Sequence, residues 1–283
     1  MKITVGICAY NESNRNLQLL IKKYLEELKD ELEEIIVVGN TNGEYRADKV
    51  VFIYEKERRG KSRAINSILR LAKGDVIVIS DADIMPIDGS IKALIKPLRD
   101  GYGASCPRPI PTVKEGLIGF LNEVIYRVQL DANSNEEFFH LPGKITVVRK
   151  GVVREIPEDT INDDALIGLY SLMKGFRNKY VKESKVLFHP PQNLVEHLKQ
   201  RKRIFLGHLQ LWRRYGVVVP SMNPITVFLK IRKVFNRLTP TETLYFMIGI
   251  VLEAIARAWG LLAFILGSND DKWDIANSTK WGF

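Results

Sequence analysis

Short apolar runs and longer helical patterns alternate along the first half of the chain. The apolar runs lie at residues 3–8, 35–38, 50–54 and 76–80. They are rich in Val and Ile, as buried parallel strands are, and apolar residues at helical spacing fill 14–29 and 62–72 between them. This alternation predicts an α/β domain with a mostly parallel sheet. Ligands of such sheets bind beyond the carboxyl ends of the strands.

The second half of the chain is mixed and then becomes helical. We expect a helix over 115–130, a strand over 145–148, a helix over 163–173 and short strands near 179–181 and 186–188. From Asn193 to Tyr215 the pattern predicts a basic amphipathic helix, and residues 225–238 predict a second amphipathic segment. The last apolar stretch, 244–266, contains only two charged residues, Glu253 and Arg257.

The composition of the 283 residues is that of an ordinary globular protein, with 46% hydrophobic and 27% charged residues. It excludes a mainly disordered chain, a collagen-like chain and a disulfide scaffold. The two cysteines, Cys8 and Cys106, lack the spacing of a zinc site and predict free thiols in a reducing compartment. Because Met1 and Lys2 run directly into a strand-like stretch, we expect no signal peptide.

The net charge of +9 is concentrated in one stretch of the chain. Ten of the 42 Lys and Arg residues lie between Lys199 and Arg237, where there is no acidic residue, so the rest of the chain is close to neutral. A basic stretch of this kind fits nucleic acid or an anionic membrane surface. We expect no nucleic-acid binding, because the stretch lacks interleaved aromatic residues for base stacking.

Two carboxylates, Asp81 and Asp83, stand one residue apart directly after a predicted buried strand. Such a pair can hold a hard divalent cation, and Mg²⁺ or Mn²⁺ on oxygen ligands bridges readily to phosphates. Two solvated loop aspartates are the alternative that the spacing alone leaves open. A helix that opens with Gly60 and Lys61 offers a second feature suited to a diphosphate.

Five motifs follow one another over about residues 1 to 210. They are Tyr10-Asn11-Glu12, Gly60-Lys61 with Ala64 and Asn66, Asp81-Ala82-Asp83, Asp163-Asp164 ahead of a helix that ends in Lys174-Gly175-Phe176, and Gln200 to Arg203. In this order they resemble glycosyltransferase family 2, the inverting enzymes that use nucleotide sugars. The resemblance implies a GT-A (Rossmann-like) mostly parallel sheet flanked by helices over residues 1–215. An amphipathic and hydrophobic helical region over 216–283 would follow it.

The resemblance also implies roles for individual side chains. Asp164 would be the general base that takes the acceptor proton, and Arg203 would neutralise the leaving diphosphate. Asp81 and Asp83 would face the diphosphate and its Mg²⁺ or Mn²⁺, with Asp83 as the direct ligand. His189 either adds a metal contact or is a structural strand-end histidine. The other donor-binding candidates are Ala9, Tyr10, Asn11, Glu12, Asn40, Lys61, Asn66 and Gln200.

The chain departs from the family pattern at two places. Members usually carry Asp-Asp-Gly-Ser after the second strand, and here the run from Val38 to Glu44 offers only Asn40 for the nucleoside. The Gln-x-x-Arg-Trp motif ends in Ile204 instead of Trp, which favours single transfers over a processive polysaccharide synthase. A non-catalytic scaffold that binds a nucleotide or anionic lipid remains a further alternative.

The apolar segment 244–266 predicts membrane attachment. As a helix it is about 34 Å long, enough to cross a bilayer core or to serve as a shallow anchor, and a buried core helix is the alternative. Glu253 and Arg257 lie four residues apart and can pair. The basic stretch before the segment predicts a cell-membrane protein with its catalytic domain on the cytoplasmic side. We therefore expect a UDP- or GDP-sugar donor, a lipid-linked or membrane-proximal acceptor and an anionic membrane surface as partners, and the sequence leaves a second copy of the chain open as a further partner.

Overall fold

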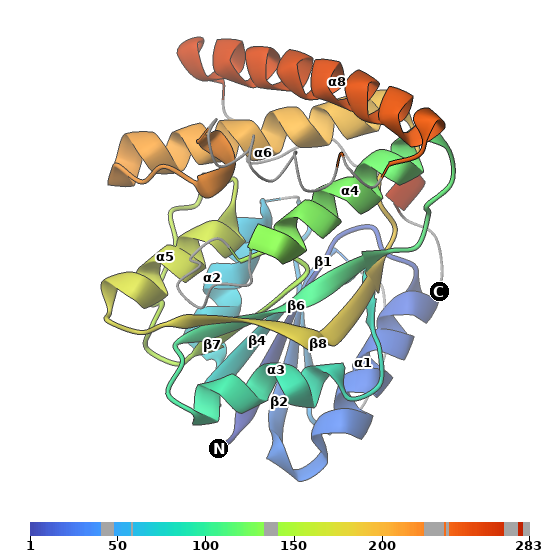
Figure 1. Ribbon diagram of the computed structural model, residues 1–283. Helices are drawn as coiled ribbons and strands as arrows, with labels where there is room; N and C mark the ends of the chain where they lie inside the picture. Colours follow the sequence, from blue (N-terminus) through green and yellow to red (C-terminus); the bar gives the residue numbers. More distant parts are fainter. Residues whose placement is uncertain are drawn as a thin grey trace.

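The computed structural model describes residues 1–40, 48–57, 59–132, 141–223, 235, 238–268 and 277–279. In this part of the chain eight strands form one sheet with helices on both faces (Figure 1). The strands are β1 (Ile3–Ala9), β2 (Leu32–Gly39), β3 (Val50–Tyr54), β4 (Val76–Asp81), β5 (Ile84–Pro86), β6 (Ala104–Pro111), β7 (Ile145–Arg149) and β8 (Asn178–Phe188). The α-helices are α1 (Asn14–Leu28), α2 (Lys61–Leu71), α3 (Ser90–Arg99), α4 (Gly116–Ala132), α5 (Asp163–Met173), α6 (Leu194–Tyr215) and α8 (Pro240–Ile265). Short 3₁₀ helices cover Lys29–Glu31, Pro220–Met222 and Asn277–Thr279.

The order of the strands brings several strand ends to one edge of the sheet. The order is β3-β2-β1-β4-β7-β6-β8-β5, and β1 pairs in parallel with both β2 and β4. The carboxyl ends of these three strands, at Ala9, Gly39 and Asp81, therefore meet at the same edge. β7 is antiparallel to β4, with Ser80 opposite Ile145, so β7 begins where β4 ends. The predicted α/β fold with a mostly parallel sheet is confirmed.

The two faces of the sheet are covered by different helices. On one face, α1 and α3 bury side chains such as Leu20 and Leu94 against β1 and β4. On the other face, α2 and α5 bury side chains such as Ile68 and Leu166 against β2 and β6. Gly6 lets α2 approach closely, because a Cβ at this position would lie 2.3 Å from the Cγ2 atom of Ile68. The core thus fixes the start of α2 and α5 above the same edge of the sheet.

The structure differs from the sequence expectations in two regions, residues 84–111 and residues 178–188. It adds β5, α3 and β6, for which the sequence analysis predicts no element, and one continuous strand, β8, replaces the two short strands expected near 179–181 and 186–188. β6 contains Pro107, Pro109 and Pro111, a composition that argues against a central strand. Its neighbour β7 pairs only with Ala104 and Ser105, so the prolines fall beyond that ladder. The amphipathic segment expected over 225–238 lies outside the described residues except at 235 and 238.

Helices α6 and α8 lie against each other across one side of the molecule (Figure 1). α6 begins at the cap Asn193, whose side chain accepts from Glu196 N–H, and ends at Gly216, which has a φ of 67°. α8 begins with a capping box between Thr239 and Glu242. Both helices confirm the sequence expectation, whereas the domain boundary between 215 and 216 stays a prediction.

A charged cluster joins α8 to α6. Arg201 on α6 donates from Nε and Nη2 to the two carboxylate oxygens of Glu253 at 2.8 and 3.1 Å. Arg257 donates from Nε to Glu253 at 2.8 Å and from Nη2 to the carbonyl of Ser221 at 3.1 Å. The two charged residues of the apolar segment therefore pair with each other, as expected, and also face α6.

The opposite face of α8 is apolar and exposed. Its side chains include Leu244, Met247, Val251, Ile255, Leu262 and Ile265. By length and composition, α8 is also long and apolar enough to cross a membrane, with 17% of its most apolar window buried. Exposed apolar faces of this extent are typical of interaction surfaces.

Candidate active site

A cavity of about 760 Å³ opens at the edge of the sheet where β1, β2 and β4 end. The loop after β1 contributes Tyr10 and Glu12, and the end of β4 contributes Asp81 and Asp83. The starts of α2 and α5 add groups from one side, and α6 adds Gln200, Lys202 and Arg203 from the other, completing a polar lining. The cavity therefore lies where the sequence pattern predicts ligand binding in a sheet of this kind.

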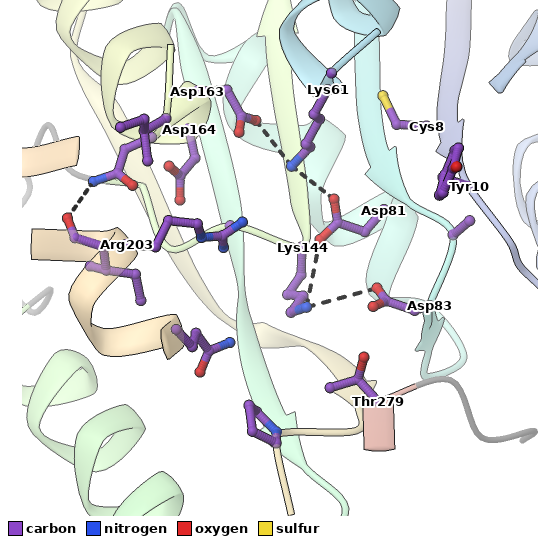
Figure 2. A pocket seen from close by; sticks show the side chains of 18 of the residues that line it. Cys8, Tyr10, Lys61, Asp81, Asp83, Lys144, Asp163, Asp164, Arg203 and Thr279 are labelled. Carbon is purple, nitrogen blue, oxygen red and sulfur yellow. Dashed lines mark hydrogen bonds and ion pairs between the residues drawn. The ribbon is translucent and has the colours of Figure 1, made fainter. Parts of the chain in front are cut away.

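Lys61 links two of the acidic motifs. As the first residue of α2, it follows Gly60, whose φ of 99° few other residues could adopt. Its Nζ lies 2.8 Å from Asp81 Oδ1 and 3.1 Å from Asp163 Oδ2 (Figure 2). Burial would lower the pKa of Lys61, but these two carboxylates outweigh it and hold that pKa well above its usual value. Lys61 is thus a permanent cation between the end of β4 and the start of α5.

Lys144 lies beside both carboxylates of the Asp81-Ala82-Asp83 motif. Its Nζ is 3.6 Å from Asp81 Oδ2 and 3.8 Å from Asp83 Oδ1 (Figure 2). Lys144 directly precedes β7, and its carbonyl accepts a hydrogen bond from Asp81 N–H at 2.9 Å. Sequence reasoning missed this residue, because its position depends on the antiparallel pairing of β7 with β4.

The two carboxylates of the motif have different electrostatic environments. Burial raises the pKa of Asp83, and Lys144 only partly offsets it. Burial acts in the same direction on Asp81, but there Lys61 and Lys144 outweigh it, so the pKa of Asp81 lies below its usual value. Asp81 is therefore firmly anionic, whereas Asp83 has less compensation for its charge.

Asp164 stands at the start of α5 and also faces the cavity. Its Oδ1 accepts from Ala165 N–H at 2.8 Å, and a Cβ on Gly143 would lie 3.1 Å from its Oδ2. Burial raises the pKa of Asp164, with Lys61 acting in the opposite direction. A carboxylate with a raised pKa and an open side is suited to accept a proton.

Two thiols and one histidine in this region have structural explanations. Burial raises the pKa of Cys8 to about 12, and burial raises the pKa of Cys106 as well, so neither is a reactive thiolate. His189 lines the cavity, and its Nδ1 lies 2.6 Å from Thr112 Oγ1. This hydrogen bond fits the structural alternative for His189, and the metal contact stays a prediction.

Most of the residues predicted for donor binding line the cavity, and three do not. Those that line it are Ala9, Tyr10, Glu12, Lys61, Asp81, Asp83, Gln200 and Arg203, together with Asp164 and His189. Asn11 and Asn40 lie beside this lining, where Asn11 N–H donates to Asn40 Oδ1 at 2.9 Å. Asn11 has a φ of 57°, so this bond fixes a tight turn after β1.

Asn66 is buried behind the cavity wall and has a structural role. Its Nδ2 donates to the carbonyl of Ile156 at 2.8 Å, and its Oδ1 accepts from Ile156 N–H at 2.9 Å. Ser62 on the same helix donates to the carbonyl of Thr160 at 3.0 Å. These bonds hold the segment before α5 on α2, and they therefore position Asp164 without contact to the cavity.

Asp81 and Asp83 offer the carboxylate oxygens that a hard divalent cation prefers. Across the described residues there is no group of three or more His, Cys, Asp or Glu side chains that could hold a metal by themselves. Two neighbouring carboxylates are nevertheless what Mg²⁺ uses when substrate phosphates supply further ligands. The residues fit a metal that is shared with a diphosphate, provided that the Lys144 ammonium makes room.

The cavity lining also includes three side chains from outside the predicted motifs. Tyr126 comes from α4, Trp259 from α8 and Thr279 from the short helix that follows α8 in the described chain. The neighbouring Ser278 bonds the start of α6, where it accepts from Gln192 N–H at 3.1 Å. No local motif marks these residues: Trp259 reaches the cavity through the packing of α8 on α6, and Tyr126 reaches it from α4, where its ring packs edge-on against Phe188.

Two family profiles match the chain. Residues 4–157 match the profile described as "Glycosyl transferase family 2", and residues 108–268 match "Glycosyl transferase family group 2". The chain belongs to glycosyltransferase family 2. The resemblance drawn from the five motifs is thereby confirmed.

Individual relatives of this family 2 chain share only low sequence identity with it. A poly-beta-1,6-N-acetyl-D-glucosamine synthase of Staphylococcus aureus is 23% identical over 220 residues, which cover 71% of this chain and 53% of the synthase. The chain thus spans about half the length of the curated relatives it matches. An uncharacterized glycosyltransferase of Bacillus subtilis, YfnE, is 31% identical over 104 residues, covering 34% of this chain and 26% of that protein.

A solved mannosyltransferase structure has the same fold. The mannosyltransferase PcManGT from Pyrobaculum calidifontis, in complex with GDP-Man and Mn²⁺, matches with a TM-score of 0.59 and 19% sequence identity. The match covers 96% of this chain and 87% of that one. The GT-A fold predicted from the motifs is confirmed.

Proposed function

We propose that this family 2 chain transfers a sugar from a nucleoside diphosphate sugar to an acceptor hydroxyl with inversion. The observation that carries the proposal is the convergence of Asp81, Asp83 and Asp164 on one cavity with the cations of Lys61 and Arg203. Asp81, Asp83 and the two cations suit the diphosphate. The separate carboxylate of Asp164 suits the acceptor. An inverting transfer needs this division, because the base and the leaving group act on opposite faces of the sugar.

In the proposed reaction each charged side chain has a separate role. Asp164 accepts the proton of the acceptor hydroxyl as the acceptor oxygen forms its bond to the anomeric carbon. The bond from that carbon to the diphosphate oxygen breaks, and the diphosphate leaves with the electron pair. Lys61 and Arg203 offset the charge on the leaving group. Asp81 and Asp83 would hold a divalent cation, which would further neutralise the charge of the leaving diphosphate.

The donor that we propose is a GDP- or UDP-sugar, bound with Mn²⁺ or Mg²⁺. A structural neighbour contains GDP-Man and Mn²⁺, which supports this class of donor. Ala9, Tyr10, Glu12 and Gln200 are proposed to contact it, because they line the same cavity. Asn40 and Asn11 would shape the nucleoside end from beside the lining.

The acceptor that we propose is lipid-linked or close to a membrane, and α8 supports this. Its exposed apolar face would enter the outer part of a bilayer, and its charged residues would stay paired against α6. Nearby cations flank that face: Arg213 lies 5.0 Å from the ring centre of Phe264, and Lys202 lies 5.0 Å from that of Trp259. Cations beside an apolar face favour an anionic membrane surface.

We further propose that α8 lies along the membrane and does not cross it. Near its start Phe246 packs against Val124 of α4, and near its end Ala263 packs against Leu206 of α6. Both ends of the helix therefore rest on the catalytic part. A crossing helix would carry Glu253 and Arg257 into the bilayer core, where each costs about 2.5–3.5 kcal/mol on insertion scales. The cell membrane, with the catalytic cavity on the cytoplasmic side, is the proposed location.

A processive polysaccharide synthase is the second candidate, because one relative is a poly-beta-1,6-N-acetyl-D-glucosamine synthase. The observation against it is Ile204, which lines the cavity where the family pattern has Trp. Product length separates the two candidates: a single added sugar supports simple transfer, and a ladder of products supports the synthase.

The experiment that tests the proposed function is a thermal-shift screen of UDP-, GDP- and dTDP-sugars with Mn²⁺. A bound donor raises the melting temperature of the folded chain, and we expect one nucleotide class to do so. The variant Asp83→Ala should lose that shift, whereas Asp100→Asn, an exposed carboxyl at the end of α3, should keep it. No shift with any donor would contradict the proposal.

A further inference from the structure

The position of Lys144 is built into the fold. Its carbonyl is fixed by the 2.9 Å hydrogen bond from Asp81 N–H, directly before β7 pairs with β4. Its φ of 92° lies in a region that favours glycine, so the backbone is strained at this lysine. Strained backbone at an active site is held in place by its surroundings and points to a specific role.

The side chain of Lys144 is held as well as its backbone. It is 19% exposed, and its ammonium lies 5.0 Å from the ring centre of Phe188. On the other side are Asp81 Oδ2 and Asp83 Oδ1, at 3.6 and 3.8 Å. The ammonium is thus in contact with both carboxylates that would bind a divalent cation in the proposed function.

One position next to two carboxylates cannot hold two cations. Like charges at such a separation repel strongly inside a protein, where water screens them less than in solution. A divalent cation that bridges Asp81 and Asp83 therefore requires the Lys144 ammonium to withdraw. A diphosphate entering with the cation would give the displaced ammonium a new anionic partner, since the lysine side chain is long and flexible.

We propose that Lys144 is a tethered counter-cation that occupies the metal position of the donor-free cavity, so that the divalent cation binds well only together with the diphosphate. The inference rests on the proposed function, which assigns Asp81 and Asp83 to the metal and the donor. Lys144 is a positioning residue in this account, because it acts through the two carboxylates and does not touch the reacting atoms.

The test measures binding of Mn²⁺ alone, followed by the electron paramagnetic resonance signal of free Mn²⁺. In the absence of nucleotide, we expect Lys144→Met to bind Mn²⁺ at least tenfold more tightly than the unchanged chain. Lys92→Met removes the same charge from an exposed position on α3 and should bind Mn²⁺ as the unchanged chain does. With UDP or GDP added, whichever stabilises the chain, the difference between Lys144→Met and the unchanged chain should shrink.

Lys144→Gly covers the case in which Lys144→Met fails to fold. Glycine adopts the φ of 92° without strain and removes the ammonium, so this variant should also bind Mn²⁺ at least tenfold more tightly. Mn²⁺ binding that is equal or weaker in the folded variants would overturn the inference. This titration needs no turnover, so its failure would be distinct from an absence of donor binding or sugar transfer.

Discussion

Replacing Glu253 by Gln removes the charge that joins α8 to α6. The carboxylate accepts hydrogen bonds from Arg201 and Arg257, and its side chain is only 29% exposed. The substitution keeps the shape of the side chain and leaves Arg201, which is 15% exposed, without its anionic partner. We expect a loss of stability, because a buried cation without a partner is strongly unfavourable.

The size of the loss can be worked from the pKa of Glu253. Burial would raise this pKa, but Arg201 and Arg257 outweigh it and lower it from 4.5 to about 2. At about 1.36 kcal/mol per pKa unit, the difference corresponds to roughly 3 kcal/mol of folded-state stabilisation at neutral pH. Because the side chain keeps some contact with solvent, we expect Glu253→Gln to lower the free energy of unfolding by about 2–3 kcal/mol.

Urea denaturation at pH 7, followed by tryptophan fluorescence, measures this loss. The matched control is Glu26→Gln, since Glu26 pairs with Lys22 in an exposed position where the side chains are 60% and 65% accessible. That control should change stability by less than about 0.5 kcal/mol. If Glu253→Gln were as stable as Glu26→Gln, the charged cluster would not hold α8 on α6 and the reasoning would be refuted.

The pH dependence of stability in the same variant checks the direction of the Glu253 pKa shift. The pKa of Glu253 is lower in the folded chain than the unfolded value of 4.5, so its contribution is complete above that pH. It is lost as the pH falls from about 4.5 toward about 2. The stability difference between the unchanged chain and Glu253→Gln should therefore shrink below pH 4.5, and a difference independent of pH would contradict the assignment.

Three further predictions follow from the fold and its surface. Asn66→Ala should lower the free energy of unfolding by about 2 kcal/mol in urea, because it leaves both buried backbone groups of residue 156 without their partners. Leu262→Asp should weaken cosedimentation with anionic vesicles, whereas Leu71→Asp, which changes an exposed leucine on α2, should not. Thr241→Cys and Ser268→Cys each place one cysteine near one end of α8. In vesicles that carry the protein with its cavity on the outside, the two cysteines should react equally with an impermeant maleimide. Reaction at one end only would contradict a helix that lies along the membrane.

Local sequence is enough to predict that the candidate carboxylates lie at one edge of the sheet. Asp81 and Asp83 directly follow a buried strand, and Asp164 opens a helix, so strand and helix patterns place them at one edge of the sheet. The same reasoning misplaced Asn66, because a helix-opening motif does not tell which side of the helix faces the cavity. Its two bonds to the backbone of Ile156 turn it toward the protein interior.

The remaining features depend on contacts between distant segments. Lys144 reaches Asp81 through the antiparallel pairing of β7 and β4, which the strand pattern does not specify. The sequence predicts the pair Glu253 and Arg257 from their spacing, but the third member, Arg201, lies 52 residues away on α6. β6 was missed for a different reason, since its three prolines hide a strand whose ladder with β7 is short.

Hydrolysis of the stabilising nucleotide sugar, in which water is the acceptor and nucleoside diphosphate is released with Mn²⁺ present, tests the central claim most directly. We expect the unchanged chain to release the diphosphate and Asp164→Asn to release it at least about 100-fold more slowly, while both still bind the donor. Chelation of the metal should stop release by the unchanged chain. Equal release by the unchanged chain and Asp164→Asn, or donor binding without any release, would contradict an inverting transferase built on these carboxylates.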